Sequence, residues 1–366
     1  MGVALVAAVE PDPARAAEKA AKYSIPVFAT VDELLAANLK LDAATVAVPT
    51  VHHHAVASTL LDAGLDLLVE KPIAATLAEA DDLIARAEKN NRIVQPGHLE
   101  RFNPAVLAIQ PQLRRPMFFE AHRLSVFTPR ALDVDVVLDL MIHDLDIVLT
   151  FAASPVREVR AVGLPILSPR VDIANVRVEF ESGCVANFTA SRVSTERVRK
   201  LRFFEPRQYV SIDYARQDLL VISVEPVAAK ASPAEMIASL PSQIAAMLPP
   251  GIADGIASGK IDLAKIDPAL IAQFAAMAKI DPSVIAQITN PAGSNAGLSF
   301  SKPTVTPGEP LRLEITSFLE SVGTRRGPQV TARQGREALA LALEIQSSMA
   351  AHAKRAGLED FFNPGA

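Results

Sequence analysis

The sequence has no tryptophan, few aromatic residues and a single cysteine, Cys184. One cysteine forms neither an internal disulfide framework nor a cysteine-based zinc cluster, and it fits a reducing compartment. We therefore expect a cytoplasmic protein. With aromatic residues at 5% and hydrophobic residues at 50%, the core must be built mainly from Ala, Leu, Val and Ile.

An excess of positive charge and a long hydrophobic run are absent as well. The sequence has 36 Lys and Arg against 41 Asp and Glu, a net charge of −5, which argues against a nucleic-acid partner because phosphate neutralisation needs a basic surface. The apolar start, Met1 to Glu10, reaches Pro11 before it is long enough for a signal peptide or a membrane span. We expect no membrane partner and about two domains that act on a small-molecule substrate.

The glycine loop of a dinucleotide-binding fold, G-x-G-x-x-G, is also missing. This loop normally follows the first strand and holds the pyrophosphate at a helix N-terminus. Gly2 precedes the first predicted strand instead of following one. The sequence as printed therefore has no pyrophosphate site of this kind.

The first hundred residues nevertheless alternate between apolar runs and helical patterns, which is typical of a parallel α/β sheet. Helix starts are marked by Asp12-Pro13 and by two capping boxes, Thr30 with Glu33 and Thr76 with Glu79. We predict an incomplete dinucleotide-binding domain over 1–96, an α/β, Rossmann-like, doubly wound parallel sheet without its first strand. The strands are expected at 3–9, 44–48, 66–70 and 92–95.

From Met117 onward, strands follow one another with short turns, which predicts a C-terminal α+β domain over 97–366. Its open-faced, predominantly antiparallel sheet has one solvated face. An Ala/Pro-rich segment at 229–300 predicts a helical insertion, and two helices should pack back on the sheets near the C-terminus. The clearest elements are a hairpin over 176–190, strands at 198–205, 207–213 and 218–226, a helical stripe over 311–322 and a helix from Thr331 to near Gly357.

Glu70-Lys71-Pro72 stands at the carboxyl end of a predicted parallel strand, where open α/β sheets bind ligands. A partly desolvated lysine there can relay a proton or hold a substrate hydroxyl. The alternative is a solvated lysine in a turn, since the tripeptide alone is a weak signal.

Asp139, His143 and Asp146 share one face of a predicted helix through spacings of 4 and 3. A carboxylate one turn before an imidazole can fix its tautomer, which would make His143 an acid/base near neutral pH. The alternative is a helix start with solvated acids and a satisfied histidine. No metal site is predicted here, because a third and a fourth ligand are lacking.

Three further features have weaker functional interpretations. In His52-His53-His54, adjacent side chains diverge by about 100°, so metal binding is disfavoured, although His53 could point into a cleft. Arg101 could clamp a phosphate or carboxylate, or form an ordinary salt bridge between domains. Glu10, which closes the first strand, could bind an adenosine ribose or be a simple loop acid.

In this order along the chain, these motifs resemble the Gfo/Idh/MocA family of NAD(P)-dependent sugar oxidoreductases. The resemblance covers 1–228 and 308–350. It rests on Val9-Glu10-Pro11-Asp12, Val48-Pro49-Thr50 with His53, Glu70-Lys71-Pro72, Gly97 to Pro104, and Asp139-x-x-x-His143-x-x-Asp146.

The resemblance implies a fold, a cofactor and a site. The family's fold is a Rossmann domain followed by an open-faced sheet, and its members form homodimers or homotetramers through that face. NAD is the implied cofactor, because the Glu10 carboxylate would repel the 2′-phosphate of NADP. The implied catalytic residues are Lys71, Asp139 and His143, with cofactor contacts from Glu10, Pro49, Thr50, His53, Glu70 and Lys71, and substrate contacts from Arg101, Asn103, Arg130 and Asp146.

Within the family, the segments 124–130 and 133–144 are similar to the branch that oxidises the 3-hydroxyl of UDP-N-acetylglucosamine ahead of transamination in lipid A synthesis. Arg101 and Arg130 would then contact the diphosphate. Two alternatives remain: a dehydrogenase or reductase of a free sugar or cyclitol, and a non-catalytic sugar-sensing module.

A family member would carry a strand, a glycine loop and a helix before Met1. We expect a start site placed too late, and for the chain as printed we expect poor solubility and weak NAD binding, because the edge of 3–9 is left open.

Overall fold

The computed structural model describes residues 2–128, 134–224 and 298–358. It divides into two units, one made of 1–220 with 302–366 and the other of 221–301. The predicted domains, 1–96 and 97–366, both contribute to the first unit, and the boundary between them stays a prediction. Arg130 and almost all of the predicted insertion at 229–300 lie outside the described residues. Within the described ranges, no helix has the length and apolar character needed to cross a membrane.

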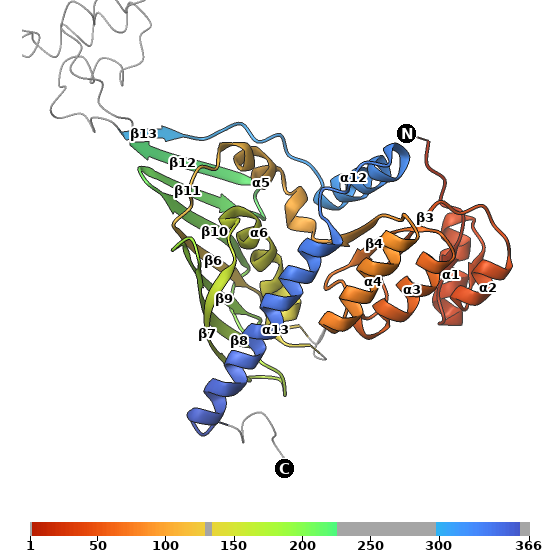
Figure 1. The fold of residues 1–366 in the computed structure, drawn as a ribbon, viewed down its shortest axis with the longest axis horizontal. Coiled ribbons are helices and arrows are strands. Elements are labelled where there is room, and N and C mark those ends of the chain that lie inside the picture. Colours follow the sequence, from red (N-terminus) through yellow and green to blue (C-terminus); the bar gives the residue numbers. More distant parts are fainter. Residues whose placement is uncertain (1, 129–133, 225–297, 359–366) are drawn as a thin grey trace, which may run out of the picture. The chain divides into compact units, whose positions relative to one another are not determined.

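The predicted alternation of strands and helices is present at the N-terminus (Figure 1). The parallel strands form two sheets: β1 pairs with β2, and β3, β4 and β5 form the other. All of these pairings are parallel, as in a doubly wound sheet. The elements are β1 (Ala8–Val9), α1 (Pro13–Tyr23), β2 (Val27–Phe28), α2 (Val31–Ala36), β3 (Ala43–Val46), α3 (His53–Asp62), β4 (Asp66–Glu70), α4 (Leu77–Lys89) and β5 (Val94–Gly97).

The first strand is shorter than the sequence predicts. A strand over 3–9 is expected, but only Ala8 and Val9 are extended and paired. Hydrogen bonds to a neighbouring strand define a strand, and Ala8 and Val9 find theirs opposite Val27 and Phe28. Val3 and Leu5 face solvent instead, with 59% and 62% of their surfaces exposed.

Local capping explains where the helices begin. Asp12 caps α1, with Pro13 at its first position, and Thr76 with Glu79 forms the predicted capping box of α4. At α2, Thr30 accepts the predicted bond from the Glu33 N–H, but the Glu33 carboxylate turns to the N–H of Ala29.

Helices cover both faces of the three-stranded sheet. On one face, Leu67, Val69 and Val94 pack in a core cluster with residues of α3 and α4, such as Leu61. On the other face, Leu68 and Ile93 pack against Phe318 of α12 (Pro310–Thr324). Burial of the apolar side chains on both faces holds β3 to β5 between two helical layers, and this packing positions the carboxyl ends of these strands.

The second region is a large mixed sheet with strands in the order β12-β11-β10-β6-β9-β8-β7. The predicted hairpin is β8–β9, and β6 runs parallel to β9, a pairing between non-consecutive strands that the sequence does not indicate. The last residues of β12 lie in the second unit, where they pair with β13. The strands are β6 (Phe118–Leu124), β7 (Val156–Leu164), β8 (Ile173–Phe180), β9 (Val185–Ser191), β10 (Val198–Glu205), β11 (Gln208–Asp213), β12 (Asp218–Val224) and β13 (Leu298–Ser301).

The connection between the two regions contains η2 (Leu99–Phe102), α5 (Pro104–Ile109) and η3 (Gln110–Gln112). The helix that carries Asp139 and His143 is not a plain α-helix: it begins as a π-helical turn, η4 (Val137–Met141), and continues as α6 (Ile142–Ala152). Apolar spacing carries no signature of such a turn, which is often found at functional sites. The long C-terminal helix α13 (Ala332–Arg355) packs on the large sheet at β7, as predicted, and also contacts α4 and α6 (Figure 1).

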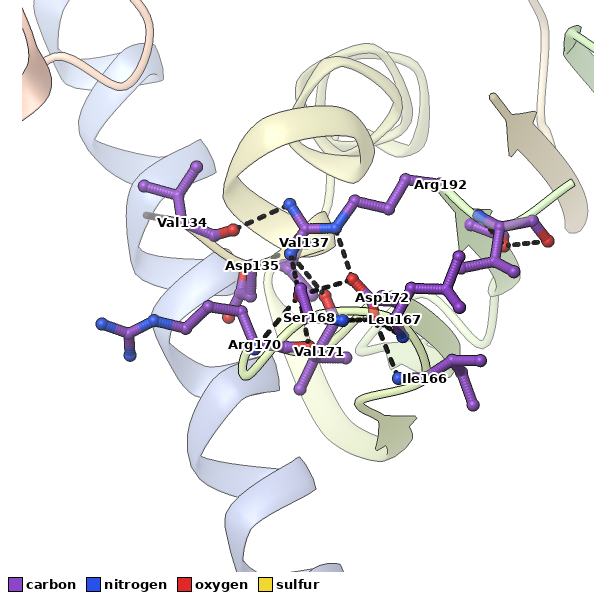
Figure 2. Close-up of polar contacts among 12 residues, drawn as sticks. Val134, Asp135, Val137, Ile166, Leu167, Ser168, Arg170, Val171, Asp172 and Arg192 are labelled. Carbon is purple, nitrogen blue, oxygen red and sulfur yellow. Dashed lines mark hydrogen bonds and ion pairs between the residues drawn. The ribbon is translucent and has the colours of Figure 1, made fainter. Parts of the chain in front are cut away.

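A buried ion pair anchors the segment that enters the π-helical turn (Figure 2). The Arg192 guanidinium donates to the Asp172 carboxylate over 2.7 Å and to the carbonyl of Val134 over 3.0 Å. Burial alone would raise the pKa of Asp172, but hydrogen bonds from Ser168, the backbone of Ile166 and Arg192 hold it well below its usual range. This carboxylate therefore stays ionised and binds Arg192 inside the protein.

We predict that Arg192→Met lowers the free energy of unfolding by about 3 kcal/mol, because it leaves the Asp172 carboxylate buried without its cation. Arg160→Met is the matched control: Arg160 pairs with Glu158 at 2.6 Å, but its side chain is 77% exposed, so less than about 1 kcal/mol should be lost. Urea titration measures both, and equal losses would contradict the prediction.

Glu314 on α12 generates a second prediction. Burial, and then the charge of Glu70, raises the pKa of Glu314 to about 8 from 4.5. Between these values the folded chain keeps a proton that the unfolded chain releases, so stability falls as the pH rises, by at most about 1.4 kcal/mol per pH unit.

Glu314→Gln should remove this part of the pH dependence and stabilise the protein most at pH 8. Glu88→Gln, at a 60% exposed side chain, should leave the dependence unchanged. Unfolding curves at pH 5, 6.5 and 8 provide the comparison, and an unchanged slope for Glu314→Gln would refute the explanation.

Candidate active site

The candidate site begins at the edge of the sheet where β3, β4 and β5 end. These strands are parallel, so the residues that follow them lie along the same edge. Pro49 and Thr50 follow β3, Glu70 and Lys71 lie at the end of β4, and Gly97 ends β5. An added Cβ on Gly97 would come within 3.2 Å of Glu70, so glycine permits the close approach of these two strand ends.

Lys71 reaches from this edge to the π-helical turn. Its Nζ donates to the main-chain carbonyls of Asp139, over 2.6 Å, and Leu138, over 3.4 Å, and lies 4.0 Å from the Asp139 carboxylate. Burial lowers the pKa of Lys71, and the negative charge of Asp139 partly opposes this effect. The main chain of the turn therefore positions a lysine that exchanges its proton more readily than a solvated one.

His143 lies one turn further along, on α6. Burial first, and then the positive charges of Lys71 and Arg123, lower the pKa of His143 well below 6.5. Its Nδ1 is buried without a hydrogen-bond partner among the described residues, so the Asp139 carboxylate does not bind this nitrogen. A neutral imidazole close to a lysine cation is suited to accept a proton from a substrate hydroxyl.

A buried network behind His143 was not predicted from the sequence. Arg123 of β6 forms two hydrogen bonds with Asp144, over 2.7 and 3.1 Å, and one with Glu100, over 3.1 Å. The sequence does contain an indication of this network. In β6 every second residue is buried, and Arg123 is in step with Phe119 and Ala121, so the alternation predicts a buried arginine that needs charged partners.

Three of the four residues predicted to bind substrate are described by the structure, and their side chains are buried. Arg101 and Asp146 are buried with 3.7 Å between guanidinium nitrogen and carboxylate oxygen. The Asn103 side chain is also buried, where it caps α5 and donates to Glu100 and to the carbonyl of Tyr214. Arg130 lies outside the described residues.

The histidines predicted to diverge do so. His53 is buried, with Nδ1 2.8 Å from the carbonyl oxygen of Pro72 and Nε2 2.8 Å from that of Val48. His54 contacts Asp82 instead, over 2.7 Å. No group of three or more potential metal ligands is assembled in the described ranges.

The residues present fit one part of a dinucleotide. Glu10 follows β1, where an acid can bind a ribose, although it also accepts the N–H of Asp12 over 3.0 Å. Pro49, Thr50, Glu70 and Lys71 lie at the carboxyl ends of β3 and β4, where open α/β sheets bind ligands. A glycine-rich loop for the pyrophosphate is not found in the described part of the chain.

A cavity of about 600 Å³ lies elsewhere, between β7, β8 and α13. Arg160, Arg177 and His352 are among its lining residues, and it contains none of the candidate site residues.

Comparison of the sequence with models of known protein families identifies the family of this chain. Residues 2–98 match the model of an oxidoreductase family with an NAD-binding Rossmann fold, and residues 106–207 match the GFO/IDH/MocA C-terminal domain. The two matches together cover more than half of the chain. The chain belongs to the Gfo/Idh/MocA family. The predicted Rossmann-like domain and open mixed sheet are thereby confirmed.

Two curated Gfo/Idh/MocA relatives are similar over part of their length. Over 206 residues, 56% of this chain, the sequence is 40% identical to UDP-N-acetylglucosamine 3-dehydrogenase of Acidithiobacillus ferrooxidans, and the match spans 65% of that protein. Over 169 residues it is 30% identical to inositol 2-dehydrogenase of Acidothermus cellulolyticus, with 44% of this chain and 49% of that one covered. The chain thus spans less than two thirds of either relative.

The fold of the chain is also similar to that of solved structures. The structure of UDP-N-acetylglucosamine 3-dehydrogenase from Acidithiobacillus ferrooxidans matches with a TM-score of 0.71 and 28% identity, over 97% of this chain and 90% of that one. Levoglucosan dehydrogenase in complex with NADH shares the fold, with a TM-score of 0.68 and 14% identity over 94% and 87% of the two chains.

The geometry predicts unequal effects at Lys71 and Asp139. Lys71→Met removes the ammonium group itself and should lower kcat at least 100-fold. Asp139→Asn should cost less, because the shortest contact of Lys71 is to the main-chain carbonyl of residue 139, which the substitution keeps. Steady-state NADH absorbance ranks the two variants, and a larger loss for Asp139→Asn would contradict this order.

Proposed function

We propose that the chain is an NAD-dependent dehydrogenase that oxidises the 3-hydroxyl of UDP-N-acetylglucosamine. The observation that carries this proposal is the juxtaposition of Lys71, Asp139 and His143 in a chain that is 40% identical, over 206 residues, to an enzyme named for that reaction.

His143 serves as the base in the proposed reaction. It is neutral near pH 7, so it can take the hydroxyl proton without first losing one. Lys71 donates a hydrogen bond to the same oxygen and stabilises negative charge that develops there, while the main-chain carbonyl of Asp139 holds the lysine and its carboxylate lies 4.0 Å away. NAD, when bound, supplies the hydride acceptor.

Further parts of the proposal concern recognition. Glu10 favours NAD, because its carboxylate would repel a 2′-phosphate. Arg101, Asn103, Arg130 and Asp146 are proposed substrate contacts, with Arg101 and Arg130 toward the diphosphate. The product ketone suits a later transamination, as in lipid A synthesis.

We also propose a homodimer or homotetramer through the open face of the sheet. That face presents polar partners on neighbouring strands, such as Asn175 with Thr189 and Arg177 with Asn187.

A second candidate is the oxidation of a free cyclitol or sugar, which the 30% identity to an inositol 2-dehydrogenase favours. The same three residues would serve that reaction, because it also removes a hydride and a hydroxyl proton from one carbon centre. A non-catalytic sensor would need none of them.

NADH absorbance with UDP-N-acetylglucosamine, myo-inositol and glucose distinguishes these candidates. We expect turnover with the nucleotide sugar and at least a 100-fold lower kcat for His143→Asn, while His54→Asn, at a histidine paired outside the site, keeps wild-type turnover. Because the printed sequence lacks the glycine loop, any longer form that the gene encodes is assayed beside it. Turnover with inositol alone would mean that the substrate is a cyclitol and not the nucleotide sugar. Equal turnover in both histidine variants would mean that His143 is not part of the site.

The pH profile tests the state of His143. Because its pKa is lowered, kcat/KM for oxidation should stay level as the pH falls from 8 through 6.5. A decline centred at pH 6.5 would mean that the imidazole titrates as in water.

A further inference from the structure

A group of buried polar side chains behind His143 has unused hydrogen-bonding capacity. His98, Arg101 and Asp146 are each at most 4% exposed. Within the described residues, both ring nitrogens of His98, one guanidinium nitrogen of Arg101 and Oδ2 of Asp146 have no hydrogen-bond partner. Buried groups of this kind are nearly always paired, so the absence of partners needs an explanation.

The carboxylate of Asp146 is the centre of this group. His98 Nδ1 lies 3.9 Å from Oδ2, and Arg101 Nη1 lies 3.7 Å from Oδ1. Both distances exceed a hydrogen bond but leave the carboxylate flanked on two sides. Arg101 is itself held through Gln329, whose side chain donates to the Arg101 carbonyl over 3.3 Å.

His143 belongs to the same group through its buried nitrogen. Nδ1 of His143 has no partner within the part of the chain that the structure describes, and Asp146 follows three positions later on α6. Side chains three apart on a helix are neighbours on its surface. A ring nitrogen and a carboxylate oxygen, both buried and both unpaired among the described residues, thus belong to neighbouring positions on the helix.

Asp139 is a weaker partner for this nitrogen. Its carboxylate lies 4.0 Å from Lys71 Nζ and is 28% exposed. Asp139 therefore interacts with the lysine on the solvent-accessible side of the helix. Asp146 is on the closed side, where a hydrogen bond to an imidazole is not weakened by competition with water.

We propose that Asp146 is the positioning partner of His143: its Oδ2 accepts the Nδ1–H of His143, and His98 and Arg101 hold the carboxylate in place. This deepens the proposed function, on which it rests for the direction of proton transfer. With the proton on Nδ1, Nε2 is the free base. When the substrate O–H bond breaks, its proton moves to Nε2, and the imidazolium formed is stabilised by the Asp146 carboxylate. The electron pair of the O–H bond then forms the C=O bond, and the hydrogen of the C–H bond leaves with its electron pair as hydride, which NAD would accept when bound.

Contacts of this type are often long in the free enzyme and shorten in the complex. Among the described residues Asp146 pairs with His98 and Arg101 and not with His143, so the contact with His143 is expected to form when His143 becomes charged. In this role Asp146 acts on His143 rather than on the substrate, and the role takes the place of the substrate contact proposed above for Asp146.

The tautomer of His143 tests the proposal directly. Nitrogen-15 NMR of the histidine rings in the full chain, assigned with His143→Asn, should show the Nδ1–H form in the wild type. In Asp146→Asn, whose side chain can donate as well as accept, the Nδ1–H population should fall. Asp82→Asn, which alters the exposed His54–Asp82 pair, is the matched control and should leave His143 unchanged.

Kinetics of the NAD-loaded enzyme provide the second readout. Asp146→Asn should lower kcat about 10³-fold with KM within about threefold, and His98→Gln should lower kcat about tenfold. A wild-type Nε2–H tautomer would overturn the proposal, even if Asp146→Asn fails to fold. A raised KM with unchanged kcat would return Asp146 to substrate binding. If the wild type has no turnover with any sugar tested, the proposed function fails, while the tautomer still decides the role of Asp146.

Discussion

The site depends on the buried pairing of Arg123 with Asp144 and Glu100. This arginine lies on β6, near the middle of the large sheet, and its partners lie on α6 and on η2, the connection after β5. One side chain therefore fixes the helix that bears His143 against both the large sheet and the end of the Rossmann-like region. All three side chains are buried, so each charge needs its partner in place. A buried charge left without its partner would lower the free energy of unfolding by several kcal/mol.

The same cation shapes the chemistry of its neighbours. Burial first, and then the charges of Lys71 and Arg123, lower the pKa of His143, although Arg123 is itself balanced by two carboxylates. Burial also lowers the pKa of Lys71, and the negative charge of Asp139 partly opposes this effect. The two groups therefore titrate under the influence of the same buried charges.

Much of this architecture follows from local signals in the sequence. Capping residues such as Thr76 and Thr331 mark helix starts, and the alternation of apolar residues over 198–205 gives a strand with those bounds. Motif order is enough to indicate Lys71 and His143. Three features could not be predicted in this way: the π-helical turn, the parallel pairing of β6 with β9, and the partners of Arg123. The strand pairing and the partners of Arg123 depend on contacts between segments far apart in the chain, and apolar spacing does not distinguish a π-helical turn from an α-helical one.

The placement of His53 links two loops at the carboxyl ends of the strands. Its ring bridges the carbonyls of Val48 and Pro72, which belong to the loops after two adjacent strands. The two loops are therefore joined through one buried imidazole, whose contacts are next to Pro49 in one loop and next to Lys71 in the other. His53 thus fixes the spacing of the two loops at the sheet edge from the interior of the protein, without itself lying at that edge.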